Sequence, residues 1–466
     1  MTMGRRAKHL PPGPPTLPIL GNLHQIPQKG SYLTFTKWAK QYGGLYSLKL
    51  GTGTAVVVTD RRIVKELIDK KSSKYSNRPP SYVSHDLITS GDHLLVMQYG
   101  QQWRTFRKLV HQYFMESMVE KRHVEVQNAE ATQMLRDMCE NWSKVMEPGN
   151  TPPVDIYPFL HWVPQSLFGN WVSRSKDVGA EMNKLYGSAL DRVRERRRSK
   201  GSKDSLMDSL LEQEDKLGLT NHQLYFLGGV LMEGGSDTSS SIILAFIQAM
   251  TKWGHVLVKA QEEIDSVVGE DRTPVWADYT KLPYVATIVK EAQRWRPAVP
   301  LAFPHAAAED DWIDGQFIPK GTVVILNAWG MHHDQKRFPD PDTFDPDHYK
   351  GQTTLAPELA ASADYGSRDH YGYGSGRRIC PGIHLAERNL FLAIAKIIWA
   401  FSIKPGVDEQ GKEVELDINP QTGYGEGFLL CVKDFPCKIT PRSEARRETI
   451  MREFNEAQKV FSKFNA

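Results

Sequence analysis

Ten residues in the last quarter of the chain decide the fold, and they read Tyr373-Gly374-Ser375-Gly376-Arg377-Arg378-Ile379-Cys380-Pro381-Gly382. Their three glycines allow tight turns and a close approach to a flat ligand, because no Cβ stands in the way. A helix is predicted directly afterwards, over 384–401, so Cys380 lies near its amino end, where N–H groups and the positive dipole stabilise a thiolate. A thiolate gives electron density to a haem iron and favours O–O cleavage. Cys380 is therefore the candidate axial ligand of a haem.

Two simpler explanations compete for the same loop. Cys380 could be a small buried hydrophobic residue, which is an ordinary role of a free cysteine. The glycines could instead hold a phosphate, but no Gly-Lys-Ser/Thr ending follows them, and no GxGxxG stands between a strand and a helix. Arg378, two residues before the cysteine, favours the haem, because a guanidinium can pair with a haem propionate.

The loop resembles the F-x-x-G-x-R-x-C-x-G pattern of the cytochrome P450 family. Tyr373, Gly376, Arg378, Cys380 and Gly382 occupy its defined positions, with tyrosine in place of phenylalanine as the single departure. The resemblance extends from the proline-rich segment near the start to about residue 440. It implies the cytochrome P450 fold, mainly α with a small β-rich region, enclosing haem b (iron protoporphyrin IX). It also implies that Cys380 binds the iron and that Gly376, Arg378 and Gly382 lie beside the cofactor.

A second pattern interrupts the longest predicted helix, 224–253, which follows a cap signal at Thr220. There Gly234-Gly235-Ser236-Asp237-Thr238 separates two apolar runs. Adjacent glycines cost a helix about 1 kcal/mol each relative to alanine, so the segment could be a helix break, a new cap at Ser236, or a groove for dioxygen. It is similar to the family's A/G-G-x-D/E-T-T/S motif, which implies that Thr238 hydrogen-bonds dioxygen at the iron and that Asp237 relays protons.

Three further residues are candidates for holding the haem propionates. Trp103 and Arg107 lie four residues apart on a predicted helix, 101–113, so an indole N–H and a guanidinium can reach one carboxylate. They are similar to the family's W-x-x-x-R, which binds a propionate. His305 stands where family members place another propionate donor, although a lone histidine is more often structural. The His332-His333-Asp334 sequence shows no third metal ligand and is interpreted as a solvated turn.

Glu291 and Arg294 form an E-x-x-R on a predicted helix, 284–295, with both side chains on one face. In isolation such a pair is an ordinary surface ion pair. The resemblance implies instead a buried structural pair behind the cysteine loop. The family's P-E-R-F motif reads Pro346-Asp347-His348-Tyr349 here, so His348 is expected to replace the arginine that joins the pair.

The substrate space is expected on the face of the long helix that carries Thr238, since helical steps back from it reach small and apolar residues. Family resemblance adds two phenylalanines from later segments. The expected pocket residues are Leu231, Gly234, Gly235, Phe303 and Phe428. An apolar wall with few polar groups suits a mid-sized, hydrophobic, ring-containing substrate that is held mainly by burial.

Composition narrows the protein's class. The chain of 466 residues is 40% hydrophobic and 24% charged, as in ordinary globular proteins, and its net charge of +3 does not suggest a nucleic-acid partner. No stretch reaches the roughly 18 apolar residues that span a bilayer. The four cysteines, Cys139, Cys380, Cys431 and Cys437, form no CxxC pair. Cys431 and Cys437 could be bridged, but free thiols in a reducing compartment are favoured.

Three segments are predicted along the chain: a basic leader and proline-rich hinge (1–15), a single haem-binding catalytic domain (16–440) and an amphipathic helical tail (441–466). A hairpin is expected at 45–50 and 55–59, and short strands between 299 and 327. The tail places Ile450, Phe454, Ala457, Phe461 and Phe464 on one helical face. A stiff proline run suits a spacer. We expect it to follow an apolar anchor in the endoplasmic reticulum membrane, with the domain in the cytosol; a naturally soluble protein is the alternative.

The sequence thus predicts a monomeric monooxygenase that uses two electrons and O2 to oxidise an apolar substrate. Electrons would come from NADPH through a separate cytochrome P450 reductase, because the chain has no Rossmann fingerprint and no room for a flavin domain. The cations Arg107, Lys108, Lys121, Arg122 and Arg377 could form its docking face or simply a solvated surface.

Two other functions remain open. A haem-thiolate isomerase or peroxygenase would need no reductase, but such enzymes have little use for Asp237 and Thr238. A non-catalytic haem-binding protein is the other alternative. Within the family, the hinge and the 339–349 segment are similar to those of fungal secondary-metabolism enzymes such as O-methylsterigmatocystin oxidoreductase.

Overall fold

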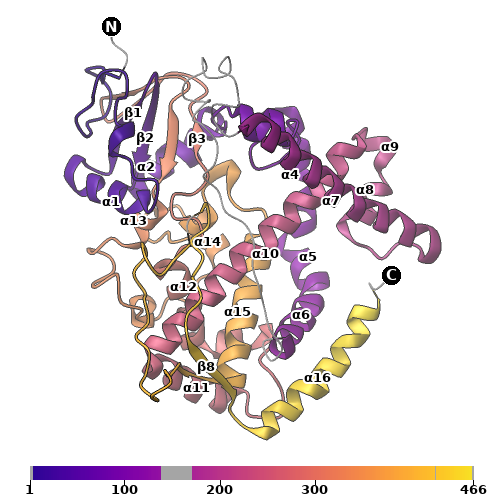
Figure 1. The fold of residues 1–466 in the computed structure, drawn as a ribbon. Helices are drawn as coiled ribbons and strands as arrows, with labels where there is room; N and C mark the ends of the chain where they lie inside the picture. Colours follow the sequence, from indigo (N-terminus) through magenta and orange to yellow (C-terminus); the bar gives the residue numbers. More distant parts are fainter. Residues whose placement is uncertain (1–3, 138–169, 426, 464–466) are drawn as a thin grey trace.

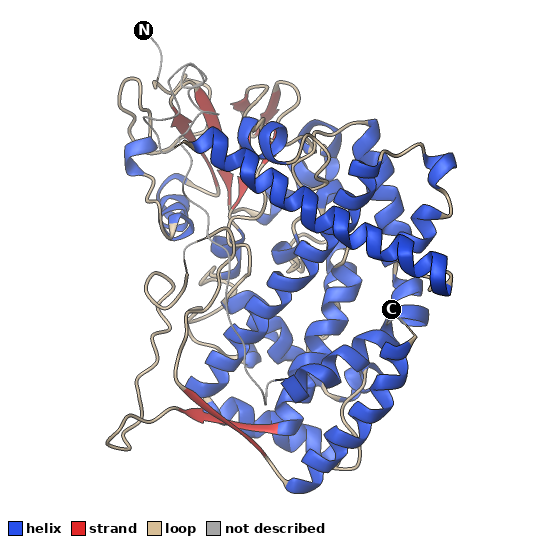
Figure 2. Cartoon of the chain, turned by 45° about the vertical axis from the view of Figure 1, so that its right-hand side comes forward, coloured by secondary structure: helices blue, strands red, loops and turns tan. Residues whose placement is uncertain are grey.

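The computed structural model describes residues 4–137, 170–425 and 427–463. Cys139 and Phe464 lie outside these ranges. The described chain is mainly helical, with short strands gathered toward its amino-terminal side and one further pair of strands at the opposite end (Figure 1, Figure 2). The helices are α1 (Ser31–Tyr42), α2 (Arg61–Val64), α3 (Ser72–Tyr75), α4 (Gln101–Phe114), α5 (Glu116–Met118), α6 (Val124–Asp137), α7 (Trp171–Lys200), α8 (Leu206–Leu211), α9 (Glu214–Leu217), α10 (Asn221–Lys252), α11 (Gly254–Val267), α12 (Pro283–Trp295), α13 (Ala328–His332), α14 (Ala356–Ala361), α15 (Ile383–Ala400) and α16 (Glu444–Ser462).

The strands form three small sheets. The first has the order β1-β2-β6-β3 and the others are the pairs β4-β5 and β7-β8. The strands are β1 (Leu45–Leu50), β2 (Gly53–Val58), β3 (His305–Ala306), β4 (Asp311–Ile313), β5 (Gln316–Ile318), β6 (Val323–Leu326), β7 (Phe401–Pro405) and β8 (Cys437–Pro441). The predicted hairpin is β1-β2, with Leu45 opposite Val58, and β6 joins β2 in parallel. The expected short strands after residue 299 are confirmed as β3 to β6.

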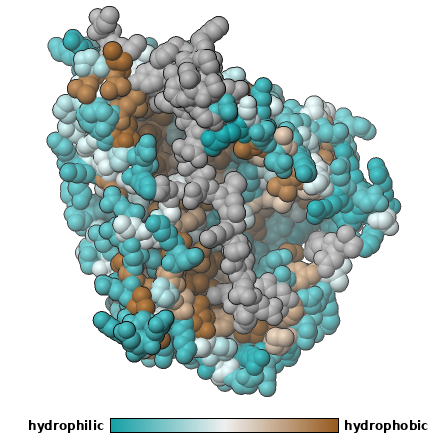
Figure 3. Space-filling view, viewed as in Figure 1, coloured by the Kyte–Doolittle hydropathy of each residue, from teal (hydrophilic) through white to brown (hydrophobic). Residues whose placement is uncertain are grey.

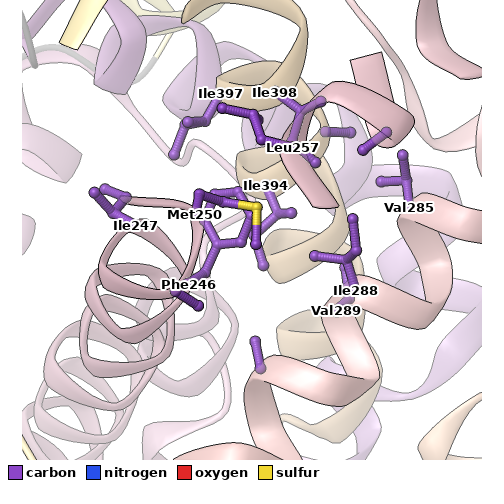
Figure 4. Packing of buried hydrophobic residues seen from close by; sticks show 14 of the residues in the cluster. Phe246, Ile247, Met250, Leu257, Val285, Ile288, Val289, Ile394, Ile397 and Ile398 are labelled. Carbon is purple, nitrogen blue, oxygen red and sulfur yellow. The ribbon is translucent and has the colours of Figure 1, made fainter. Parts of the chain in front are cut away.

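The largest core cluster joins four helices, α10, α11, α12 and α15. Figure 4 shows Phe246 and Met250 of α10 pointing toward Ile394 of α15 and Ile288 of α12, and all four side chains are buried. Burying such a side chain contributes about 1.5–3 kcal/mol. This core therefore fixes α15, which follows the cysteine loop, against α12 and the carboxyl-terminal half of α10.

The helix α10 is continuous across its glycines, so the break or second cap considered at Ser236 is wrong. Thr220 caps it, its hydroxyl accepting the Gln223 N–H while the Gln223 side chain accepts the Thr220 N–H. Buried residues flank the glycine segment on both sides, with Leu227 before it and Ile242 after it. Tertiary packing of the two ends outweighs the low helix propensity of the middle.

The amino-terminal hinge and the tail helix both pack on the domain. Arg6 donates hydrogen bonds to the carbonyls of Gly13 and Pro14 and to the Ser47 hydroxyl of β1. The tail helix α16 lies along α6, with Ile450, Phe454 and Ala457 buried. Hydrophilic side chains line the periphery in Figure 3, while hydrophobic ones gather toward its middle and beside the amino-terminal segment.

The solvated turn at His332 and His333 is wrong, because both side chains are buried and His333 stacks on Trp329 with ring centroids 3.8 Å apart. Cys431 and Cys437 are free, as favoured. Within the described ranges no single helix is long and apolar enough to cross a membrane, and α10 and α11, bent by 106° where they meet, reach that threshold only together.

Candidate functional site

The cysteine loop follows a short 3-10 turn, Tyr371–Tyr373, contains a second one, Gly376–Arg378, and ends at the start of α15. The Cys380 N–H donates to the Tyr373 carbonyl at 2.8 Å, which closes the loop. Gly376 has a φ of +65°, and a Cβ there would lie 2.2 Å from the Ile68 carbonyl oxygen. Only glycine fits both the left-handed backbone and this close approach. The loop is thus locked onto the π-helical turn Lys65–Lys70.

Cys380 keeps some exposed surface within this loop. Burial raises the pKa of its thiol, while the Gly382 N–H and the Arg107 guanidinium oppose that rise. The sulfur therefore has one backbone donor and one cation nearby, the partners that favour a thiolate. Because desolvation dominates, the net direction of the pKa is upward, which differs from the thiolate stabilisation expected at a helix amino end.

Three arginines converge near the loop without an anionic partner. Burial, together with Arg78 and Arg107, lowers the pKa of Arg378 to about 8, and burial lowers that of Arg78 to about 10. Burial also lowers the pKa of Arg107. Among the residues that the structure describes, no carboxylate forms an ion pair with any of the three. Gathering three desolvated cations is unfavourable unless an anionic ligand joins them.

The hydrogen bonds of this cluster show which guanidinium groups are already engaged. Arg378 donates to the carbonyls of Ser76, Leu94 and Met97 and lies over the Trp103 ring at 4.3 Å. Neither the Arg107 guanidinium nor the Trp103 indole N–H donates a hydrogen bond to any residue in the described part of the chain. These two donors on α4 are therefore available to a ligand, and the cluster fits a group that carries two carboxylates, as haem does.

Arg78 was missed by the sequence reasoning. Its guanidinium donates to the carbonyls of Leu95, Phe303 and Pro304. It thereby ties the segment before α4 to the segment before β3. The only local signal was an arginine before Pro79-Pro80, which marks an extended stretch but says nothing about which residues lie nearby in space.

His305 begins β3 beside this cluster and is buried. Its Nδ1 lies 2.8 Å from the Tyr75 carbonyl, so Nδ1 carries the proton and donates. Burial, and then the charges of Arg78 and Arg378, lower the pKa of His305 to about 3. The ring is thus neutral here. Its Nε2 can donate to a carboxylate only when the ring carries a second proton, and a nearby carboxylate favours that protonation.

The pair of Glu291 and Arg294 lies behind the loop with both side chains fully buried. Arg294 donates through Nε and Nη2 to the two carboxylate oxygens, each at 2.7 Å. His348 Nδ1 lies 3.1 Å from Glu291 Oε1, and its Nε2 lies 2.7 Å from the Pro339 carbonyl. Arg294 also donates to the carbonyls of His332 and Pro341. The three charged side chains thus fasten α12 to the 339–349 segment.

The middle of α10 is exposed, in contrast to the buried pair of Glu291 and Arg294. Residues 232–237 are all exposed, and a Cβ added to Gly234 or Gly235 would meet nothing within 4 Å. The Thr238 hydroxyl donates to the Gly234 carbonyl at 2.8 Å, which leaves its oxygen free to accept. Asp237 is exposed and forms no hydrogen bond to Thr238. α10 crosses the centre of the molecule in Figure 1. The open segment lies between buried residues of the same helix, with Leu227 before it and Ile242 after it.

The remaining pocket candidates fall into two places. Leu231 packs into a cluster with Trp103, Phe106 and Leu227, which joins α10 to α4. Phe303 and Phe428 contact each other with ring centroids 4.0 Å apart, although they come from distant segments. Leu231 therefore serves packing between helices, whereas Phe303 lies close to Arg78, which stands 5.7 Å from its ring centre.

Four of the five cations of the predicted docking face lie on the surface. Lys108, Lys121, Arg122 and Arg377 are exposed. Arg107 is not available for docking, because it is largely buried and belongs to the arginine cluster. Its position on α4, four residues after Trp103, turns it toward the interior.

Comparison with known proteins agrees with these features. The family model of cytochrome P450 matches residues 11–144 and 121–422. The chain is 50% identical to a cytochrome P450 monooxygenase of Arthrobotrys oligospora, over 99% of this chain and 94% of that protein. It is 50% identical to the cytochrome P450 monooxygenase macC of Penicillium terrestre, over 97% of this chain and 94% of that protein. It is also 50% identical to the cytochrome P450 monooxygenase patH of Aspergillus clavatus, over 99% of this chain and 95% of that protein.

Proposed function

The chain belongs to the cytochrome P450 family and is a haem-thiolate monooxygenase, and from that premise we propose that it inserts one atom of O2 into a hydrophobic secondary metabolite. Its electrons come from NADPH through a separate cytochrome P450 reductase. The observation that carries the proposal is the cluster of Arg78, Arg107 and Arg378 beside the cysteine loop, which has no ion-pair partner among the described residues.

We infer that haem b binds between the cysteine loop and α10. Its two propionates supply the negative charge that the arginine cluster lacks, and the free donors of Trp103 and Arg107 hold one of them. His305 gains a proton and donates to a propionate. Cys380 would provide the thiolate that holds the iron, with Gly376 and Gly382 keeping the backbone close. When bound, a haem-thiolate supplies the activation of dioxygen.

The open segment of α10 is assigned to substrate and proton handling. Thr238 accepts a hydrogen bond at its hydroxyl oxygen, because its own hydrogen bond to Gly234 orients the oxygen lone pairs away from the helix. Asp237, exposed one residue earlier, exchanges protons with solvent. Gly234 and Gly235 leave room for the substrate, and Phe303 with Phe428 forms an aromatic wall.

We place the enzyme, as a monomer, on the cytosolic face of the endoplasmic reticulum membrane. Hydrogen bonds of Arg6 fix the proline-rich hinge on β1. An apolar helix preceding the hinge would therefore hold the domain at a defined orientation to the membrane. The exposed cations Lys108, Lys121, Arg122 and Arg377 suit an acidic reductase. Fractionation of cells that express the full gene product would test the location, since recovery in the soluble fraction contradicts it.

The experiment that tests the reaction combines a substrate screen with isotope labelling. Hydrophobic ring compounds are first screened for a spin-state shift of the purified haem protein, and binders are then incubated with reductase, NADPH and 18O2. We expect a product that carries one labelled oxygen and requires both reductase and NADPH. The Gly234→Phe variant should retain its carbon monoxide spectrum but lose the spin-state shift. An unlabelled product, or equal product formation without reductase, would contradict the proposal.

A further inference from the structure

A carboxylate stands at the edge of the open segment of α10 and is held by two other parts of the chain. Glu233 immediately precedes Gly234. His93, from the segment before α4, lies with Nε2 3.0 Å from Glu233 Oε2, and the Tyr186 hydroxyl of α7 donates to Oε1. Three separate elements therefore meet at one acidic side chain, which the sequence analysis did not single out.

The hydrogen bonds fix the direction of each donor. The His93 Nδ1 accepts the Leu95 N–H at 3.3 Å, so the proton of the neutral ring is on Nε2, which donates to Glu233. Both donors are buried, His93 with 8% of its side chain exposed, whereas the Glu233 side chain is 44% exposed. The donors are thus packed in place, and the carboxylate presents its free side outward.

Aromatic packing holds this arrangement. The Tyr186 ring lies on Gly229, one turn before Glu233, where a Cβ would come within 2.4 Å of the ring. Phe226 contacts Tyr186 edge-on with centroids 5.3 Å apart and His93 with centroids 6.4 Å apart. Gly229 is therefore the residue that lets Tyr186 reach Glu233, and Phe226 limits the movement of both donors.

The Glu233 carboxylate keeps part of its hydrogen-bonding capacity free. A carboxylate offers about four lone-pair positions, and two donors occupy only part of them. In the described part of the chain, no lysine or arginine forms an ion pair with Glu233. A third donor in the open space beside Gly234 would meet an unneutralised acceptor, which makes a stronger hydrogen bond than a neutral group does.

We propose that Glu233 is the specificity-determining residue of the substrate pocket, and that the natural substrate is a hydrophobic compound with a hydroxyl group that donates to this carboxylate. The inference rests on the proposed function, which places the substrate beside Gly234. It also changes the expectation of a pocket that holds its substrate mainly by burial. A site that hydrogen-bonds a hydroxyl discriminates strongly against analogues without it, because the carboxylate is then left with an unmatched polar surface.

The test uses azoles, whose nitrogen binds a haem iron and shifts its spectrum whatever the natural substrate is. The dissociation constants of 1-phenylimidazole and of 2-, 3- and 4-(imidazol-1-yl)phenol are measured by this shift. In the unaltered protein we expect at least one hydroxylated isomer to bind about tenfold more tightly than 1-phenylimidazole, as one charge-assisted hydrogen bond provides. In Glu233→Gln this preference should fall about tenfold, with the affinity for 1-phenylimidazole changed less than twofold.

Controls separate the possible failures. Glu262→Gln removes an exposed carboxylate from the neighbouring α11 and should leave every ratio unchanged. If the preference is absent from the unaltered protein, or persists in Glu233→Gln, the proposed role of Glu233 is overturned and the haem site is not. No spectral shift with any azole would overturn the haem site and this inference with it. If Glu233→Gln loses haem, Tyr186→Phe is the second test: it removes one donor, and an unchanged preference for the hydroxylated isomer would overturn the inference.

Discussion

The cysteine loop and the middle of α10 are both rich in glycine, and the two regions use it in opposite ways. At Gly376 the left-handed backbone and the Ile68 carbonyl leave no space for a side chain. At Gly234 the backbone is helical and nothing lies within 4 Å of an added Cβ. Glycine in the loop is thus required by the fold, whereas glycine in the helix is tolerated at a cost in stability and leaves space for a ligand.

The surroundings of the two regions differ in the same way. Behind the loop, Glu291, Arg294 and His348 form a buried network with short hydrogen bonds. Around the middle of α10, Glu233 and Asp237 are exposed. Low local packing is typical of regions where ligands enter, and dense packing of regions that hold geometry. The comparison therefore predicts that substitutions behind the loop change stability, while those along α10 change binding and turnover.

The largest effect is expected behind the loop. Glu291→Gln leaves the Arg294 charge buried without its counterion, and such losses typically destabilise a protein by about 3–5 kcal/mol. Glu444→Gln is the matched control, because Glu444 and Arg447 have the same spacing on α16 but are 70% and 65% exposed, so a change below about 0.5 kcal/mol is expected. Chemical unfolding followed by haem absorbance measures both. Equal effects would show that the buried pair does not hold the loop.

The next largest effect is expected at Gly376 and Gly234, where substitution by alanine should change the free energy of unfolding in opposite directions. Gly376→Ala forces a Cβ against the Ile68 carbonyl in a left-handed backbone, so we expect a loss of about 1–3 kcal/mol. Gly234→Ala places a better helix former in open space and should gain up to about 1 kcal/mol. Both are measured as shifts of the unfolding midpoint. The same sign in the two variants would contradict the distinction between the two regions.

A smaller, functional effect is expected at Thr238. Thr238→Ala removes the hydroxyl but no packing that the fold requires, because this residue lies on the open side of α10. Haem content and the carbon monoxide spectrum should be unchanged, while a several-fold larger share of the NADPH electrons should end as hydrogen peroxide. The ratio of product to NADPH is the measurement. Unchanged coupling would remove Thr238 from proton handling.

The smallest effect concerns pH. Burial lowers the pKa of His348, but the hydrogen bond and charge of Glu291 and the Pro339 carbonyl raise it more, so the net shift is upward. Its stabilising contribution is then full below the unfolded pKa of about 6.5 and is lost as the pH rises through the higher folded value.

His348→Arg keeps the positive charge at all these pH values, so the fall in stability with rising pH should become flatter. His348→Gln is the control that lacks the charge throughout. Unfolding midpoints measured between acidic and mildly alkaline pH distinguish the three proteins. An unchanged slope in the arginine variant would show that His348 does not titrate against Glu291.

Local patterns predicted most elements to within a few residues. The helix predicted at 101–113 is α4 (Gln101–Phe114), and that at 284–295 is α12 (Pro283–Trp295). These predictions succeed because periodicity, caps and prolines act over neighbouring residues. The burial of His332 and His333 was missed, since it depends on α13 packing beneath residues distant in sequence.

The site was predicted unevenly for the same reason. Cys380 and Arg378 stand in one short motif, so their proximity is visible in the sequence. Arg78 lies near them through contacts between distant segments: Arg378 donates to the Ser76 carbonyl, 302 residues away, and Arg78 donates to the Phe303 carbonyl, 225 residues away. The contact of Glu233 with His93 and Tyr186 likewise needs three elements to meet, and α10 remains helical through its glycines only because both of its ends are buried.

The most direct test of the central claim, that Cys380 is the thiolate ligand of a haem, is the carbon monoxide difference spectrum of the reduced protein. The unaltered protein is expected to show the thiolate-type band. Cys380→Ala and Cys380→His should lose that band entirely, whereas Cys431→Ala, which removes an exposed free thiol, should retain it. Persistence of the thiolate-type band in either Cys380 variant would contradict the account.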